Sequence, residues 1–171
     1  ANFGRNVSSA GDVNGDGKAD VIVGAYLADD GSNAGSARIF SGADGSILYT
    51  FNGDSASDLF GYSSVASAGD VNGDGKADVI VGAHRDDNNG TDSGSARIFS
   101  GADGSILYTF NGDRAADYFG YSVAGAGDVN GDGKADVIVG AYNNWNRGSA
   151  RIFSGADGSI LYTFNGVTTN G

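Results

Sequence analysis

The chain has 171 residues and a formal net charge of −11, and all 21 of its acidic residues are Asp. This length suits one domain with a real core, and 40% hydrophobic residues argue against disorder. An acidic surface disfavours nucleic acid and anionic membranes as partners, since both attract cationic proteins. The sequence contains no Cys, which excludes disulfides, and no apolar run long enough for a transmembrane helix. We therefore expect no nucleic-acid binding and no membrane insertion.

One unit is repeated three times along the chain. The segment GDVNGDGKAD stands at 11–20, 69–78 and 127–136, and GSARIFSGADGSILYTFNG stands at 35–53, 94–112 and 148–166. Internal repeats of this length are typical of propellers and solenoids. We predict three blades at residues 1–57, 58–116 and 117–171. The identity of the copies indicates recent amplification or deliberate design, and a start at Ala rather than Met suggests a processed, trimmed or engineered chain.

Each unit is predicted to form four short β-strands, which in the first unit cover residues 3–12, 20–26, 36–42 and 46–53. The first strand is rich in Gly, Ala and Ser, which suits the narrow inner end of a tapering sheet. The second is apolar on both faces, as in a strand that is buried on both sides. The fourth alternates between its two faces, and GADG before it predicts a hairpin. No segment has a helical period.

Four antiparallel strands in a repeat of this length predict an all-β fold made of β-propeller blades, three four-stranded blades per chain. A β-sandwich and a β-solenoid are the alternatives. A solenoid favours a shorter repeat, and a sandwich does not need three identical units.

The acidic loop between the first two strands has the spacing of a calcium-binding loop. Side-chain oxygens occupy positions 1, 3, 5 and 9, a backbone carbonyl occupies position 7, and a Gly at position 6 allows a sharp turn with positive φ. We predict one Ca²⁺ per blade, three per chain. The predicted ligands are Asp12, Asn14, Asp16, Lys18 (by its carbonyl) and Asp20; Asp70, Asn72, Asp74, Lys76 and Asp78; and Asp128, Asn130, Asp132, Lys134 and Asp136.

The choice of calcium depends on the ligand chemistry. Three carboxylates held close together repel one another unless a cation lies among them, and hard oxygen ligands favour Ca²⁺ over Zn²⁺. The alternative is a solvated turn rich in Asp and Asn, which threefold repetition disfavours. The loop is not an EF-hand, because position 12 is Val23 in a β-branched run and not a bidentate Glu before a helix.

These motifs together resemble FG-GAP repeats, the blades of the integrin α-subunit N-terminal propeller. The matching segments are FG at 3–4, 60–61 and 119–120, VGA at 23–25, 81–83 and 139–141, and the acidic loops between them. The Pro of the family motif is missing, and Tyr26, His84 and Tyr142 stand after the Gly-Ala. The resemblance implies calcium in these loops, an extracellular or secreted adhesion role, and ligand binding on the opposite face. It also implies a ring of usually seven blades.

Three blades are too few to close a ring, and an open stack leaves two apolar faces exposed. We expect two chains to form a six-bladed homodimer by twofold symmetry, the commonest oligomer symmetry. A larger ring and a fragment of a longer parent are the alternatives.

The loops between the second and third strands differ between copies, and loops on a rigid scaffold often bind ligands. Trp145 and Arg147 in the third copy would suit a protein or glycan ligand, although Trp145 could simply cover a blade edge. His84 and Arg85 are weaker candidates, and we expect His84 to be an exposed loop residue. Arg38, Arg97 and Arg151 recur in every unit, and we expect them to pair with neighbouring Asp residues.

Catalysis is disfavoured by the residue types present. Asp58, Asp86, Asp87 and Asp117 are conceivable carboxylates for glycoside hydrolysis, but no Glu or Cys and a single His are available. We expect a calcium-binding, integrin-like module that is not an enzyme, or an engineered repeat without an evolved ligand. A calcium-dependent lectin is the alternative function.

Overall fold

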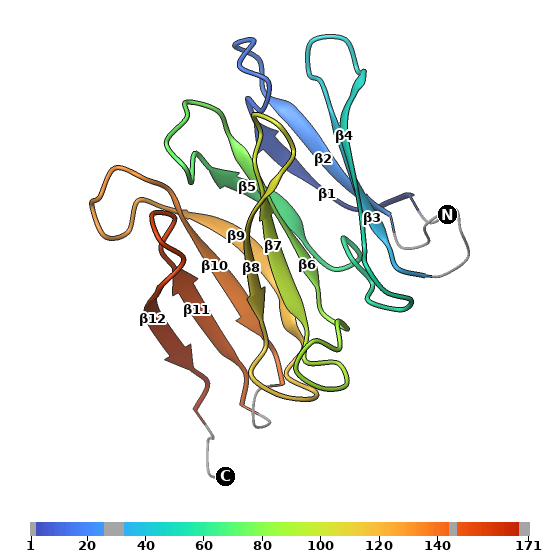
Figure 1. The fold of residues 1–171 in the computed structure, drawn as a ribbon, viewed down its shortest axis with the longest axis vertical. Coiled ribbons are helices and arrows are strands. Elements are labelled where there is room, and N and C mark those ends of the chain that lie inside the picture. Colours follow the sequence, from blue (N-terminus) through green and yellow to red (C-terminus); the bar gives the residue numbers. More distant parts are fainter. Residues whose placement is uncertain (1–2, 26–32, 144–146, 168–171) are drawn as a thin grey trace.

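The chain forms three separate four-stranded antiparallel sheets that lie side by side (Figure 1). This computed structural model describes residues 3–25, 33–143 and 147–167. Within each sheet the strands follow chain order, so every strand pairs with its neighbour in sequence. The strands are β1 (Phe3–Gly11), β2 (Asp20–Ala25), β3 (Ser36–Phe40), β4 (Ile47–Asn52), β5 (Val65–Gly69), β6 (Asp78–Ala83), β7 (Ser95–Phe99), β8 (Ile106–Asn111), β9 (Phe119–Gly127), β10 (Asp136–Ala141), β11 (Ser149–Phe153) and β12 (Ile160–Asn165).

The predicted blades are confirmed as four-stranded antiparallel sheets, and three such sheets in a row fit a β-propeller. The described residues contain no helix, as the sequence predicts. No helix in that part of the chain is therefore long and apolar enough to cross a membrane.

The hydrophobic core lies between neighbouring sheets and not within one of them. Phe51 of β4 stacks on Phe99 of β7 at 4.1 Å, Phe60 of the second blade meets Phe99 edge-on at 5.9 Å, and the three side chains are almost fully buried. A second cluster repeats this packing between the second and third sheets, with Phe110, Phe119 and Phe153. The middle sheet is covered on both sides, and every residue of its strand β6 is buried. Each blade therefore needs a neighbour to bury its faces.

The hairpin between the third and fourth strands of each sheet has the predicted tight turn. In the first copy, Gly45 N donates to Ser41 O at 2.9 Å and Ser41 N donates to Ser46 O at 2.8 Å. The other two copies repeat both hydrogen bonds within 0.1 Å.

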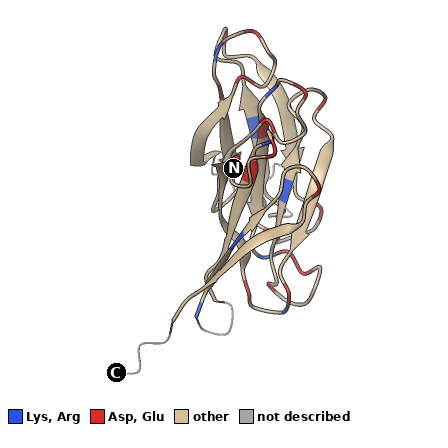
Figure 2. Ribbon diagram, turned by 90° about the vertical axis from the view of Figure 1, so that its left-hand side faces the viewer, with Lys and Arg blue, Asp and Glu red and all other residues tan. Residues whose placement is uncertain are grey.

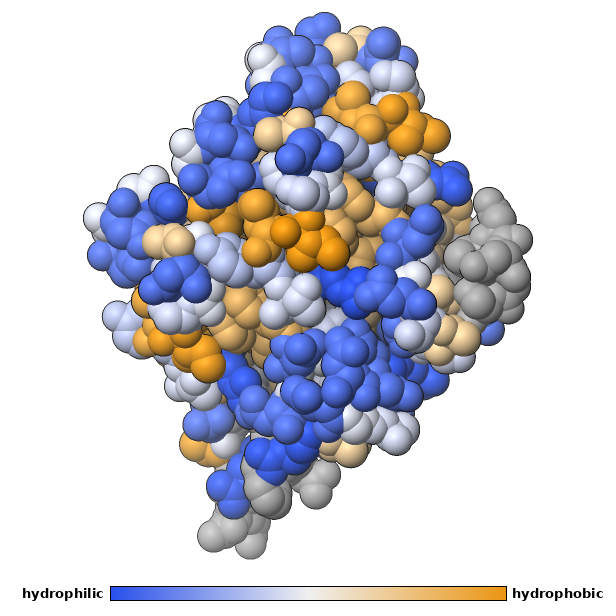
Figure 3. Space-filling view, in the orientation of Figure 1, coloured by the Kyte–Doolittle hydropathy of each residue, from blue (hydrophilic) through white to orange (hydrophobic). Residues whose placement is uncertain are grey.

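These hairpins and the acidic loops lie at one end of the sheets, and the loop between β6 and β7 lies at the other (Figure 1). Acidic residues are concentrated in the loops at both ends (Figure 2). On the face drawn in Figure 3, hydrophobic residues form separate patches with polar residues between them, and the outer strands expose Ile47, Ile106 and Ile160.

Candidate metal centres and ligand face

Each acidic loop is folded around the carboxylate at its first position. Asp12 Oδ1 accepts hydrogen bonds from Gly15 N at 2.7 Å and Asp16 N at 3.0 Å, and its Oδ2 accepts one from Gly17 N at 2.8 Å. Gly17 has a φ of 84°, as its place at position 6 predicts. The second and third loops repeat the three hydrogen bonds within 0.1 Å. The repeated sequence therefore produces one loop conformation three times.

The Asp at the ninth position connects the loop to the rest of its blade. Asp20 is fully buried, and its two carboxylate oxygens accept hydrogen bonds from Val13 N at 2.8 Å and Gly42 N at 3.0 Å. Gly42 belongs to the neighbouring hairpin, so this side chain joins the two turns at this end of the sheet. In the second copy, burial raises the pKa of the equivalent Asp78.

The donor atoms of each loop fit Ca²⁺ in chemistry, because they are carboxylate, amide and carbonyl oxygens. They are also close to one another: Asn14 Nδ2 donates to Asp16 Oδ2 at 3.1 Å, and Asn14 Oδ1 accepts from Asp16 N at 3.0 Å. Across the described residues, however, no three carboxylate or imidazole groups gather closely enough to hold a metal ion. The predicted ligands of each site thus lie within a single acidic loop, but the Asp at its ninth position accepts hydrogen bonds from backbone N–H groups.

The acidic loops of neighbouring blades contact each other directly. Ala77 N of the second loop donates to Asp12 O of the first at 3.0 Å, and Ala135 N donates to Asp70 O at the same distance. A Cβ atom on Gly15 would lie 3.5 Å from Cε of Lys76, so the stem of this lysine lies over the preceding loop. Lys18 in the first loop is exposed.

His84 lies at the opposite end of the sheets, and the expectation that it is exposed is wrong. Its side chain is buried at 5% exposure, and its ring lies 5.2 Å from Tyr121 and 6.4 Å from Tyr118 of the third blade. Ser63 Oγ lies at hydrogen-bond distance, 3.0 Å, from His84 Nδ1. Burial, with a smaller contribution from Arg85, lowers the pKa of His84 to about 4.

The rings around His84 form a continuous aromatic cluster at this end of the molecule. Tyr142 stacks on Tyr118 at 5.0 Å and meets Tyr121 edge-on at 4.7 Å, and it is 57% exposed. Arg5 lies over the ring of Tyr62 at 4.9 Å. Arg85 and Arg147 are exposed at the same end, whereas Trp145 lies outside the described residues. The sequence does not reveal this cluster, because its rings come from two blades, the second and the third.

Two of the recurring arginines, Arg97 and Arg151, pair with Asp residues, as predicted. Arg97 Nη2 lies 2.6 Å from Asp54 Oδ2, and Arg151 Nη1 donates to Asp113 Oδ1 at 2.9 Å. Each Asp belongs to the segment that leads out of the preceding blade, so each ion pair joins two blades. The signal in the sequence is that Asp follows FNG at 54 and at 113.

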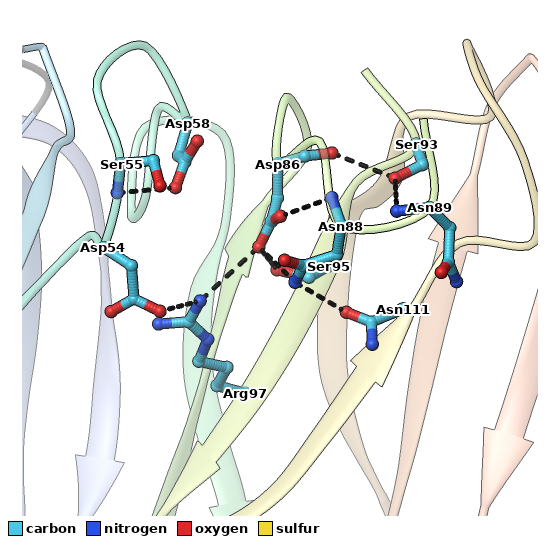
Figure 4. Close-up of polar contacts among 10 residues, drawn as sticks. All are labelled: Asp54, Ser55, Asp58, Asp86, Asn88, Asn89, Ser93, Ser95, Arg97 and Asn111. Carbon is cyan, nitrogen blue, oxygen red and sulfur yellow. Dashed lines mark hydrogen bonds and ion pairs between the residues drawn. The ribbon is translucent and has the colours of Figure 1, made fainter. Parts of the chain in front are cut away.

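Arg97 also belongs to a buried polar cluster between the first two blades (Figure 4). Asp86 is 3% exposed, and its Oδ2 accepts a hydrogen bond from Ser95 Oγ at 2.7 Å and lies 3.4 Å from Arg97 Nη2. Asp58 is 4% exposed and accepts a hydrogen bond from Ser55 N at 3.0 Å. Burial raises the pKa of Asp58 to about 6.

The other two conceivable catalytic carboxylates lie elsewhere. Asp117 accepts hydrogen bonds from Asp113 N and Arg114 N at 3.2 Å, at the start of the third blade. Asp87 accepts one from Asp92 N at 2.7 Å within its own loop. Of the four carboxylates, the structure therefore brings only Asp58 and Asp86 into the same buried polar cluster. Asp58 is bonded there to Ser55 N, and Asp86 to Ser95 and Arg97.

Comparison with known proteins identifies the repeat. The FG-GAP repeat family matches residues 3–40, 60–99 and 119–152. Human integrin alpha-11 is 36% identical over 169 residues, which cover 88% of this chain and 14% of that protein. Mouse integrin alpha-8 is 29% identical over 157 residues, with 86% and 14% covered. The chain thus spans about a seventh of these relatives.

Solved structures show a similar fold at low sequence identity. Rhamnogalacturonan lyase YesW superposes with a TM-score of 0.59 at 19% identity, over 98% of this chain and 36% of that one. A fucose lectin from Kordia zhangzhouensis superposes with a TM-score of 0.50 at 16% identity, over 92% of this chain and 99% of that one. These likenesses concern the fold alone. From its three repeats and its integrin relatives, we conclude that the chain belongs to the FG-GAP repeat family.

Proposed function

We propose that the chain is a calcium-stabilised propeller module that binds a ligand in the manner of an adhesion protein, outside the cell. The observation that carries this proposal is the acidic loop, which has the same conformation and the same oxygen donors in all three blades. Calcium would be held by the side chains at positions 1, 3, 5 and 9 and by the carbonyl at position 7. Its positive charge would offset the repulsion among the carboxylates that it draws together.

Bound calcium would make a large contribution to folding stability. When free Ca²⁺ is at a hundred times the Kd of a site, its binding stabilises the fold by about 2.7 kcal/mol. Three independent sites would contribute about 8 kcal/mol. This total is comparable with the net stability of a whole domain. The loops also contact one another through Asp12 O and Ala77 N, so order in one loop supports the next.

Calorimetric titration with CaCl₂ tests the metal sites. We expect three ions per chain, and two after Asp16→Ala, because this substitution removes the ligand at position 5 of one loop. Lys18→Ala is the matched control two residues away, and it should leave all three sites, since only the backbone carbonyl of Lys18 serves as a ligand. A wild-type chain that binds no calcium would overturn this part of the proposal.

The aromatic cluster at the other end of the sheets is the candidate ligand face. Tyr142 and Tyr121 are 57% and 45% exposed, and exposed tyrosines offer large, rigid contact area with a polar tip. Arg85 and Arg147 add positive charge beside them on an otherwise acidic protein. This combination suits an acidic or hydroxyl-rich ligand such as a protein loop or a glycan.

A calcium-dependent lectin is the second candidate, and the exposed rings of Tyr121 and Tyr142 favour it because sugars pack against aromatic faces. The fold likeness to a fucose lectin agrees with this candidate. A glycan array in calcium separates the two functions: specific sugar binding that is lost in Tyr142→Ala supports the lectin, and silence supports a protein ligand.

We expect no enzymatic activity, although the fold is shared with rhamnogalacturonan lyases. Asp86 is engaged by Ser95 and Arg97, and Asp58 is almost fully buried. Incubation with rhamnogalacturonan should therefore release no unsaturated product, as measured by ultraviolet absorbance.

A further inference from the structure

Each contact between blades inside the chain has a Phe-Gly dipeptide pressed against two glycines of the preceding blade. At the second contact, a Cβ atom on Gly82 would meet Gly120 O at 1.9 Å, and one on Gly94 would meet Phe119 O at 2.1 Å. Only glycine fits at such distances. Phe119 N also donates to Ser93 O at 3.0 Å. The first contact repeats this geometry with Gly24, Gly61, Gly35, Phe60 and Ala34.

Among the described residues, no other blade covers the equivalent two glycines of the third blade. A Cβ atom on Gly140 would lie 3.6 Å from the nearest atom, Cβ of Ser122, and one on Gly148 would approach backbone atoms of its own blade, the nearest being Tyr142 O at 3.1 Å. The hollow at this place has a volume of about 240 Å³ and is lined by Tyr121, Ser122, Gly140, Ala141, Tyr142, Gly148 and Ser149. We call it the third-blade socket.

No blade precedes the Phe-Gly dipeptide of the first blade within the described residues. Phe3 is 50% exposed, whereas the equivalent Phe60 and Phe119 are 0% and 2% exposed. A Cβ atom on Gly4 would meet nothing within 4 Å. The described chain thus carries an open socket at one end and the dipeptide that fits it at the other.

We infer that the Phe3-Gly4 dipeptide of a second copy occupies the third-blade socket, and that the reciprocal contact closes a six-bladed ring of two chains. A head-to-tail contact between identical units closes into a ring when its rotation allows. Propellers have about 4 to 8 blades, and six is the only multiple of three in that range. At the dipeptide and the two glycines, the new contact would use the same residue types as the two contacts within the chain.

The outer strands support the same pairing. Phe51 and Phe110 are buried because they stack on Phe99 and Phe153 of the next blade, at 4.1 and 4.0 Å. Phe164 is the third copy of this residue, and it is 52% exposed. In the closed ring it would stack on Phe40 of the second chain, which is the first-blade equivalent of Phe99 and Phe153.

One feature of the internal contacts is missing from the new one. Asp54 and Asp113 pair with Arg97 and Arg151 across the internal contacts. The residue that follows FNG in the third blade is Val167, which is 88% exposed. The contact between chains therefore lacks this ion pair, and it should be the weakest of the ring.

Light scattering after size-exclusion chromatography in calcium tests the inference. Wild-type protein should have the mass of two 17.1 kDa chains. Gly140→Ala should have the mass of one chain with an unchanged circular-dichroism spectrum, because the added methyl fits the open chain but not a filled socket. Gly82→Ala is the matched control: the same methyl in an internal contact should lower the melting temperature.

Val167→Asp gives a test in the opposite direction. The new carboxylate can pair with Arg38 of the second copy, and we expect the Kd of the dimer to fall about fivefold. A wild-type mass of one chain at high concentration, a mass of three chains, or a Gly140→Ala variant that stays dimeric would each overturn the inference.

Discussion

Asp58→Asn should stabilise the protein at neutral pH, because the wild-type carboxylate is ionised in a buried place. Burial raises the pKa of Asp58 from an ordinary value of 3.8 to about 6. This difference corresponds to about 3 kcal/mol of unfolding free energy, which the wild type loses as the pH rises from 3.8 to 6. The Asn side chain is uncharged and can still accept the hydrogen bond of Ser55 N.

The assay is urea unfolding of both proteins between pH 3.5 and pH 8, in saturating calcium. The variant should gain up to about 3 kcal/mol above pH 6, and the gain should shrink toward zero as the pH approaches 3.8. Nearby Arg97 lowers the pKa of Asp58, so part of the gain is offset by the lost attraction to this cation. A variant that is equally or less stable than wild type at pH 7 would refute the reasoning.

Three further predictions concern stability. Burial lowers the pKa of His84 to about 4, so the wild type should lose about 3 kcal/mol of unfolding free energy as the pH falls from 6.5 to 4. His84→Tyr, which introduces the residue of the third copy at this position, should remove that loss. An unchanged dependence of urea unfolding on pH in this acid range would contradict the prediction. Removal of calcium with EDTA should strongly lower the melting temperature, whereas an unchanged melt would exclude a structural ion. Phe110→Ala should cost about 3 to 5 kcal/mol of unfolding free energy, because Phe110 is buried against Phe153. Phe164→Ala should cost far less in a chain that Gly140→Ala keeps monomeric. Equal losses for the two variants would contradict this, because they would show that the two Phe side chains are packed alike.

The effects of Asp58 and His84 oppose each other in the wild type. Ionisation of Asp58 lowers stability as the pH rises, and protonation of His84 lowers it as the pH falls. The two windows overlap between about pH 4 and 6, so the wild-type stability should change little there. Each single variant should reveal the slope of the other residue.

Structure within one blade could be predicted from the sequence. The alternation of SILYTFNG, the GADG turn and the apolar DVIVGA run gave the strands, because these signals act between residues that are near in the chain. The positive φ of Gly17 followed from its position in the acidic loop.

Contacts between blades were harder to predict. The burial of His84 depends on Tyr118 and Tyr121 of the next blade, and the partner of Asp12 O is Ala77 N, also in the next blade. Such contacts depend on the rotation from one sheet to the next, which strand periodicity does not encode. The pairing of Arg97 was predictable only because arginine recurs in every unit.

The identity of the three β3–β4, β7–β8 and β11–β12 hairpins has a consequence for how the chain folds. SARIF could pair with any of the three ILYTFN segments in the same register, so side chains do not distinguish the native strand partner from the other two. The choice depends on the short turn, because a nearby segment arrives faster than a distant one. Refolding at high concentration should therefore produce molecules that have exchanged outer strands, and slow dilution should favour the native arrangement.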